Sequence, residues 1–168
     1  MHKHSTYFHS PLGIIKIEAT LQKITSIRFL DSIPGHHIQE TKLLNESIRQ
    51  LLEYFNKARQ NFSLPYETEG TEFQKQVWDR VAEIKYAGRA TYKDIARAAN
   101  SPNACRAVGN AVSANPLPII IPCHRIIGSH GRLGGFSSGL WRKEWLLEHE
   151  QNNMNQHLSC SDTASYKK

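Results

Sequence analysis

The hydrophobic pattern of this 168-residue chain changes its period near residue 66. Between residues 4 and 30, apolar residues such as Ile15 and Ile17 alternate with charged neighbours, which is typical of strands with one buried face. Residues 39–59 then carry apolar side chains at the spacing of an amphipathic helix. Residues 1–66 are therefore predicted to form a small α/β domain.

Beyond this point the apolar residues follow a helical period. An apolar stripe predicts a helix from Thr71 to Gly88, where the glycine would end it. Two shorter helices, Tyr92–Ala99 and Asn103–Ser113, are expected next, with an Asn-Ser-Pro turn between them. This order of helix, short turn and helix indicates a helix-turn-helix. Residues 67–150 are predicted to be a second, mostly helical domain, so the fold class is α+β.

Capping residues support the two short helices. Thr91 stands three residues before Asp94, close to the pattern of a capping box. Ser101 is placed to cap the second helix, with Pro102 in its first turn. Both helix starts are therefore encoded locally.

The C-terminal end of the chain combines an apolar helix with a polar segment. The helix is expected over Leu140–Glu150, and residues 151–168 are polar and aperiodic, which predicts a disordered tail. Cys160 lies in this tail and is not expected to be functional.

Positive charge is concentrated in one stretch of the second domain. Residues 85–143 contain nine Lys and Arg residues and one acidic residue, Asp94. Such a stretch fits a phosphate backbone as a partner. The alternative is a solvated face that only keeps the protein soluble. The overlap with the helix-turn-helix favours DNA.

Cysteine usage and the absence of apolar runs indicate a location. The three cysteines have no paired spacing, so a reducing compartment is expected. No segment resembles a signal peptide or a membrane span. The chain is therefore expected to be cytoplasmic, without a membrane partner, and monomeric.

Cys123 lies between a proline and a histidine in the segment 119–127, with apolar runs on both sides. The adjacent imidazole of His124 and guanidinium of Arg125 are surroundings that favour a reactive thiolate. The alternative is an inert buried cysteine that packs as a small hydrophobe. The surrounding motifs favour the reactive cysteine.

Two neighbouring segments could complete a site. The predicted helix 103–113 carries small residues, among them Ala107, and one long charged side chain, Arg106. It could approach DNA closely with little sequence readout, or pack against another helix. The glycine-rich segment 128–139 could be a phosphate cradle, although the wall of a pocket fits better because no Gly-Lys-Ser/Thr follows.

Four motifs carry a family resemblance. Pro-Cys-His-Arg at 122–125, Arg-Ala-Val-Gly at 106–109, Asn-Pro-Leu-Pro at 115–118 and Lys-Glu-Trp-Leu-Leu at 143–147 resemble the methylated-DNA–protein-cysteine methyltransferases, or O6-alkylguanine-DNA alkyltransferases. The resemblance covers about Phe73 to Glu150. It implies a ribonuclease-H-like first domain and a winged-helix-like second domain.

The resemblance also implies a reaction. Cys123 would take the alkyl group from O6 of guanine, or from O4 of thymine, and keep it irreversibly, so each molecule acts once. His124 would accept the thiol proton through a water, and Glu150 would orient the imidazole. Tyr92 would donate a hydrogen bond to the departing base. No cofactor and no metal are expected.

The substrate would be double-stranded DNA containing O6-alkylguanine, with the damaged base rotated out of the helix. The residues that would bind the base are Ser137, Asn115, Val112, Ile126 and Phe136. The residues that would contact DNA are Arg106, which would fill the vacated space, together with Ala107, Arg125 and Thr91. Phe136 stands where some relatives have tyrosine.

Each assigned role has a structural alternative: Tyr92 as a core aromatic, Glu150 as a solvated acid, Asn115 as a turn former. Other functions also compete. A damage sensor of this type would lack the cysteine. A sequence-specific transcription factor would need longer side chains on the second helix, and a cysteine hydrolase would need an oxyanion hole.

Overall fold

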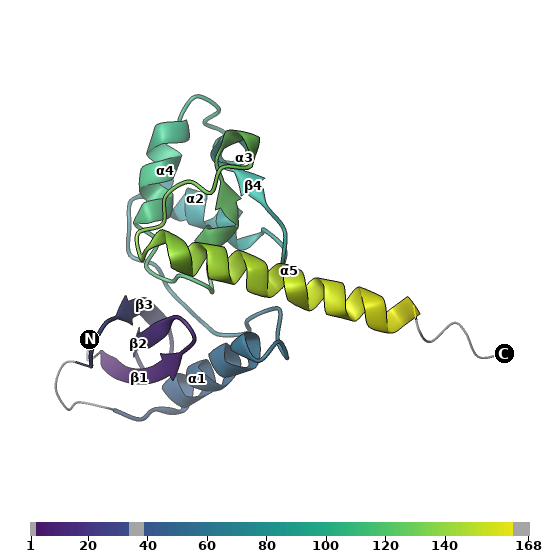
Figure 1. Cartoon of the computed structure of the whole chain (residues 1–168). Coiled ribbons are helices and arrows are strands. Elements are labelled where there is room, and N and C mark those ends of the chain that lie inside the picture. The colour runs from purple at the N-terminus through teal and green to yellow at the C-terminus, as the bar shows by residue number, and fades with distance from the viewer. Residues whose placement is uncertain (1–2, 34–38, 163–168) are drawn as a thin grey trace.

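The computed structural model describes residues 3–33 and 39–162, with side chains as far as residue 156. A small sheet with one helix lies below a cluster of short helices, and a long C-terminal helix runs between the two parts (Figure 1). The predicted α+β class and the order of its parts are confirmed. Residues 34–38 fall outside the described part of the chain.

The N-terminal part is a three-stranded antiparallel sheet with one helix. The strands β1 (His4–Ser10), β2 (Gly13–Ala19) and β3 (Ile24–Leu30) lie in chain order. Ile17 of the central strand pairs with Thr6 and Ile27, and all three side chains are buried. The alternation in the sequence thus predicts the buried face correctly.

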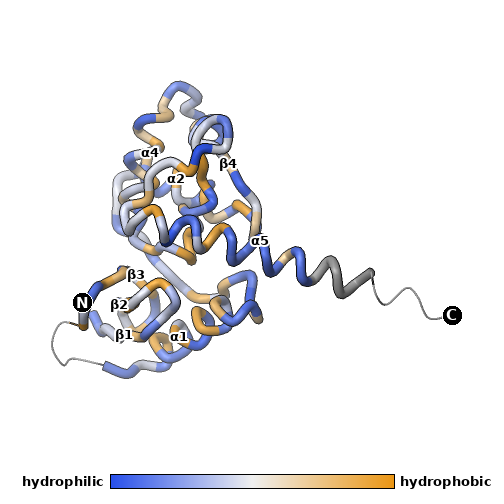
Figure 2. Tube along the Cα trace, viewed as in Figure 1, coloured by the Kyte–Doolittle hydropathy of each residue, from blue (hydrophilic) through white to orange (hydrophobic). Residues whose placement is uncertain are grey.

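Helix α1 (Lys42–Phe55) covers that face of the sheet. It begins where the Thr41 hydroxyl accepts a hydrogen bond from the Leu44 amide at 3.2 Å. Its apolar side faces the strands, as the orange positions in Figure 2 show, and Leu44, Leu51 and Tyr54 are fully buried there. Tyr54 lies near the end of α1, where the helix approaches the C-terminal helix.

The second part contains the helix-turn-helix. Helices α2 (Glu72–Ala82), α3 (Tyr92–Ala98) and α4 (Cys105–Ser113) pack on one another. Two short parallel strands, β4 (Ala90–Thr91) and β5 (Ile126–Ile127), tie the start of α3 to the segment after Cys123. The predicted helix-turn-helix is therefore present, with Thr91 and Asp94 in a full capping box.

Two predicted helix ends are wrong. Helix α2 ends at Ala82 instead of Gly88. The Ile84 carbonyl accepts from Arg125 and the Ala87 amide donates to Glu150, so these backbone groups do not continue the helix. Helix α4 begins at Cys105, and Ser101 does not cap it with its side chain. The Ser101 carbonyl instead accepts from the Ala104 amide at 2.9 Å, which closes the turn.

The prediction of a disordered tail from residue 151 is also wrong. Helix α5 spans Leu140–Asp162 and continues past Glu150. Asn153 is buried and donates to the Lys57 carbonyl at 3.3 Å and to the Tyr86 hydroxyl at 3.1 Å, so tertiary contacts extend the helix. The side chain of Cys160 and residues 163–168 lie outside the described part. Within the described part, no helix is long and apolar enough to cross a membrane.

Candidate active site

Cys123 lies at the start of a short 3-10 turn, η1 (Cys123–Arg125), directly after Pro122. Its amide donates to the Ile121 carbonyl at 2.7 Å. Asn115 fixes this segment from the preceding loop: its amide nitrogen donates to the Ile121 carbonyl at 2.8 Å, and its oxygen accepts from the Leu117 amide at 3.0 Å. Cys123 is 6% exposed, so its thiol is sheltered within a hydrogen-bonded segment.

The expectation that this environment favours the thiolate is not met in the resting protein. Burial raises the pKa of Cys123 above its ordinary value, and the nearby Asn115 side chain and Lys143 charge only partly oppose this effect. Cys123 is therefore a neutral thiol near neutral pH. A nucleophilic reaction at its sulfur requires a base to take the proton.

His124 and Glu150 form a fully buried pair that can supply this base. The imidazole Nε2 lies 2.8 Å from Glu150 Oε1. Burial acts to raise the pKa of Glu150, but bonds from His124 and Arg125 outweigh it and hold that pKa far below its usual range. Because a carboxylate cannot donate, Nε2 carries the hydrogen.

The other ring nitrogen of His124, Nδ1, then presents a lone pair. Among the described side chains, it is the only buried polar atom without a hydrogen-bond partner. Burial lowers the pKa of His124 below 6.5, although Glu150 opposes the shift, so the ring is neutral and able to accept a proton. Buried polar atoms are normally paired with protein or with ordered water, so this lone pair is available to a water molecule.

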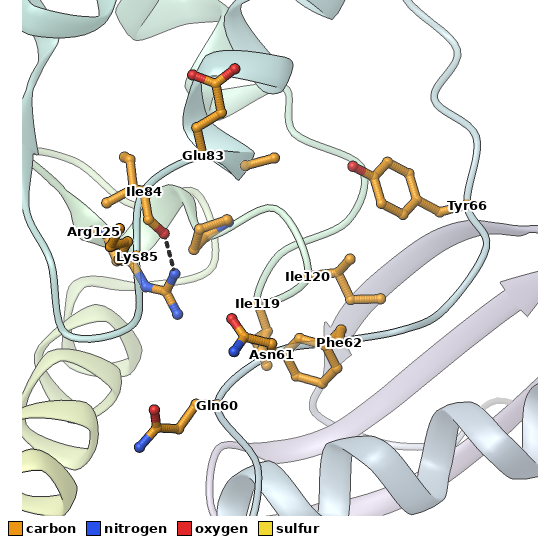
Figure 3. A pocket seen from close by; sticks show the side chains of 12 residues that line it. Gln60, Asn61, Phe62, Tyr66, Glu83, Ile84, Lys85, Ile119, Ile120 and Arg125 are labelled. Atoms are coloured by element: carbon orange, nitrogen blue, oxygen red, sulfur yellow. Dashed lines mark hydrogen bonds between the residues drawn. The ribbon is translucent and has the colours of Figure 1, made fainter.

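Arg125 does not lie where a DNA contact would require, so this prediction is wrong for the structure. Its guanidinium is buried and donates to Glu150 from Nε at 3.0 Å and from NH2 at 2.9 Å. NH1 donates to the Ile84 carbonyl at 2.6 Å, as drawn in Figure 3. The charge of Arg125 thus neutralises Glu150 inside the protein.

A cavity of about 250 Å³ lies behind the thiol segment, where Pro122 and Arg125 form part of its wall. Figure 3 shows Phe62, Ile119 and Ile120 around its apolar side. None of the predicted substrate-binding residues lines this cavity.

A second, larger groove of about 610 Å³ lies against helices α3 and α4. Tyr92 and Arg106 line it, together with Gly109 and Gly135. Tyr92 is close enough to Cys123 that the two groups interact electrostatically, and burial is the main cause of its raised pKa. The groove therefore connects the exposed Arg106 on α4 to the neighbourhood of the thiol.

Apart from Tyr92 and Arg106, the predicted substrate- and DNA-binding residues do not line this groove. Ala107 is exposed next to Arg106, whereas Val112 and Ile126 are buried in the core. Phe136 is half-buried against that core, and Ser137 is exposed on the same loop. The Thr91 hydroxyl is engaged with Asp94 in the cap of α3.

Lys143 is a site residue that the sequence reasoning missed. Its side chain is fully buried, and its ammonium donates to the Ile126 carbonyl at 2.5 Å and to the Gly135 carbonyl at 3.4 Å. Burial lowers its pKa to about 8, against the opposing effect of Cys123. The available signal is its spacing of seven residues from Glu150, which places both charges on one face of α5.

Tyr54, the other residue that was missed, donates from its hydroxyl to Glu150 Oε1 at 2.7 Å across 96 residues of sequence. No local sequence signal indicates this contact.

Among the described side chains, no three His, Cys, Asp or Glu residues gather as a metal ion would require.

A helix-turn-helix beside a sheltered cysteine with a histidine–carboxylate pair defines a class: DNA-binding proteins that react through a thiol. Residues 72–152 match the DNA binding domain of 6-O-methylguanine DNA methyltransferase, and residues 3–68 match the ribonuclease-like domain of the same family. The chain belongs to this family.

Individual relatives agree over most of their length. The chain is 44% identical over 150 residues to a methylated-DNA–protein-cysteine methyltransferase of Methanosarcina barkeri, covering 86% of this chain and 95% of the relative. It is 39% identical over 155 residues to the constitutive methylated-DNA–protein-cysteine methyltransferase of Bacillus subtilis, covering 87% and 94%.

Solved structures show the same architecture. The crystal structure of Mycobacterium tuberculosis O6-methylguanine methyltransferase has a TM-score of 0.82 at 33% identity, covering 90% of this chain and 94% of that one. A crystal structure of Mycobacterium tuberculosis OGT in complex with DNA has a TM-score of 0.81 at 33% identity, covering 91% and 94%.

Proposed function

We propose that this protein repairs DNA by moving an alkyl group from O6 of guanine to the sulfur of Cys123, once per molecule. The observation that carries this proposal is the buried His124–Glu150 pair, which holds a neutral imidazole with its accepting nitrogen, Nδ1, turned from the carboxylate, one residue from a buried neutral thiol. The family membership and the groove along α4 support the same conclusion.

In the proposed reaction, His124 Nδ1 takes the thiol proton through one water. The sulfur then forms a bond to the alkyl carbon as the bond from that carbon to O6 breaks. The electron pair of the broken bond stays on guanine, which regains one proton, so the proton lost by sulfur balances the reaction. Tyr92, half-buried in the groove near Cys123, is placed to donate a hydrogen bond to the departing base.

Double-stranded DNA is proposed to lie along α4. Rotating the damaged base out of the helix costs a few kcal/mol of stacking and pairing, and a side chain that fills the gap offsets part of this cost. Arg106 is the long exposed side chain in this groove, and Ala107 beside it lets the backbone approach closely. Ser137, Phe136 and the Ile126 carbonyl are proposed to contact the base.

The protein is further proposed to act in a reducing compartment, because the reaction needs a free thiol at Cys123. It is proposed to act as a monomer, because one chain supplies all the residues of the proposed site. The division into residues 1–66 and 67–150 is proposed as the domain boundary. It is supported by the two family matches, which leave only 69–71 between them.

Intact-protein mass spectrometry tests the function directly. After incubation with excess duplex containing one O6-methylguanine, the expected product is one added methyl group that maps to Cys123. Cys123→Ser is expected to remain unmodified while it still binds the duplex. Cys105→Ser is the matched control, since Cys105 is exposed in the groove and should be dispensable. An unmodified wild-type protein that binds damaged DNA would make it a sensor.

A further inference from the structure

Glu150 receives hydrogen bonds from four different residues, and one of them comes from the N-terminal part. Its Oε2 accepts from the Ala87 amide and from Arg125 Nε, each at 3.0 Å. Its Oε1 accepts from His124 Nε2 at 2.8 Å, from Arg125 NH2 at 2.9 Å and from the Tyr54 hydroxyl at 2.7 Å. Tyr54, on α1, is the donor contributed by the N-terminal part.

Tyr54 is held in the orientation that this bond requires. The whole side chain is buried; its ring packs edge-on against Tyr86, with ring centroids 6.1 Å apart, and at a tilt against Phe62, with centroids 5.5 Å apart. Its own carbonyl accepts from His149 Nε2 on α5 at 2.9 Å. Burial, followed by the charge of Glu150, keeps the pKa of Tyr54 well above 10, so the phenol remains a donor at all pH values of interest.

Three residues compete for the single oxygen Oε1, and one of them, Arg125, also donates to it from Nε at 3.3 Å. A carboxylate oxygen offers about two lone-pair directions, so its charge is shared among the groups that point at it. The bond from Tyr54 therefore reduces the charge that Glu150 presents to His124 Nε2, and it fixes the carboxylate in place. Both effects act on His124 Nδ1, the ring nitrogen that does not bond to Glu150: its basicity and its direction depend on how Glu150 holds the ring.

We propose that Tyr54 is a positioning residue for alkyl transfer: through Glu150, the N-terminal part sets the orientation and the basicity of His124. This inference rests on the proposed function, in which His124 is the base. Tyr54 itself touches neither the thiol nor the groove. Its effect is expected on the rate of transfer at saturation and on its pH dependence, with DNA affinity unchanged.

Other charged or titratable groups that face the His124–Glu150 pair are left unchanged by the substitution Tyr54→Phe. They are Arg125 on the same turn, Lys143 and His149 on α5, Tyr86 after α2, and Cys123.

Single-turnover rates of the full-length protein, measured from pH 5 to 9, test the proposal. Tyr54→Phe removes only the hydroxyl. The maximal rate with O6-methylguanine duplex is expected to fall about tenfold, with half-saturation unchanged. The acid limb of the pH–rate profile, where His124 becomes protonated, should move to higher pH by about 0.5. The reason is that Glu150 then presents more charge to His124 and stabilises its protonated form.

The matched control is Tyr86→Phe, which removes a hydroxyl from the same aromatic cluster, where it bonds to Asn153 instead of Glu150. Its pH profile should coincide with that of the wild type. An unchanged profile in Tyr54→Phe, or an equal loss at every pH in both variants, would overturn the proposal.

A second substitution covers the case in which Tyr54→Phe does not fold. Tyr54→3-fluorotyrosine keeps the ring and makes the phenol a stronger donor, so the acid limb should move to lower pH. A shift in the opposite direction, or none, contradicts the proposal. Titration of the His124 ring by NMR reports the same shifts without any substrate, so the Tyr54 inference is tested even if the protein transfers no alkyl group.

Discussion

The ammonium nitrogen of Lys143 lies 2.5 Å from the carbonyl oxygen of Ile126, so a fully buried cation on α5 holds the strand that follows the thiol turn. The same ammonium reaches the Gly135 carbonyl on the groove wall. One charge thus joins the segments that contain Ile126 and Gly135, and it lies close enough to Cys123 to favour its thiolate.

Lys143→Met is expected to change how stability depends on pH. Lys143 has a folded pKa of about 8 against an ordinary value of 10.5, so the unfolded chain holds one more proton between these values. Stability of the wild type should therefore rise as pH increases from 8 to 10.5. This rise should be missing in Lys143→Met and retained in the exposed control Lys85→Met. Urea titrations at pH 7, 8, 9 and 10 measure it.

Glu150→Gln is expected to weaken both stability and transfer. The change leaves Arg125 buried without a charged partner, which costs about 3 kcal/mol at pH 7. Because the folded pKa of Glu150 lies below 4.5, its contribution is present above that pH and is lost as pH falls further. The variant should lack this acid-dependent loss, and its transfer rate should fall about a hundredfold. Equal acid denaturation curves for both proteins would contradict the assignment.

Gly134→Ala is expected to disturb Tyr92. A Cβ at this position would lie 2.9 Å from the Tyr92 hydroxyl oxygen, and the backbone has φ +66°. Gly131→Ala is the matched control, because its φ is +75° and nothing lies within 4 Å of the added carbon. Both variants should lose about 1 kcal/mol of stability. Only Gly134→Ala should slow transfer, by about tenfold, and equal rates would remove Tyr92 from the reaction.

Arg106→Ala is expected to separate base rotation from chemistry. Transfer from duplex O6-methylguanine should slow about tenfold or more, whereas reaction with free O6-benzylguanine should stay within about twofold, since the free base needs no rotation. Arg80→Ala removes the same charge outside the groove, where Arg80 pairs with Glu83. Parallel losses on both substrates would refute the role of Arg106. Binding of undamaged duplex should weaken steeply with salt and vary little with sequence.

Much of the architecture follows from local patterns. The period-two alternation predicts β2, the apolar spacing predicts α1, and the Thr91–Asp94 box marks the start of α3. The errors arise where distant groups decide. Helix α2 stops at Ala82 because backbone groups at 84 and 87 bond to Arg125 and Glu150, which lie more than 35 residues further on.

The residues of the candidate site, like the elements of the fold, could be predicted only in part. The family resemblance indicates Cys123, His124, Glu150 and Asn115, and the structure places them around one buried segment. The inward direction of Arg125 could not be predicted, because an arginine beside a histidine in a basic stretch reads as a surface charge until its partner is known. Tyr54 carries no motif, since its role depends on the docking of α1 against α5.

Strand β3 lies at the edge of its sheet, and other parts of the chain bind the backbone groups along its outer side. Ile24 pairs with the segment at Tyr66, and the Ile27 amide donates to the Pro116 carbonyl at 2.8 Å, just ahead of the thiol segment. An uncovered edge strand recruits further strands from other molecules. The N-terminal part expressed alone would lose the cover from Pro116 and present a self-association surface, so the helical part also protects its partner from aggregation.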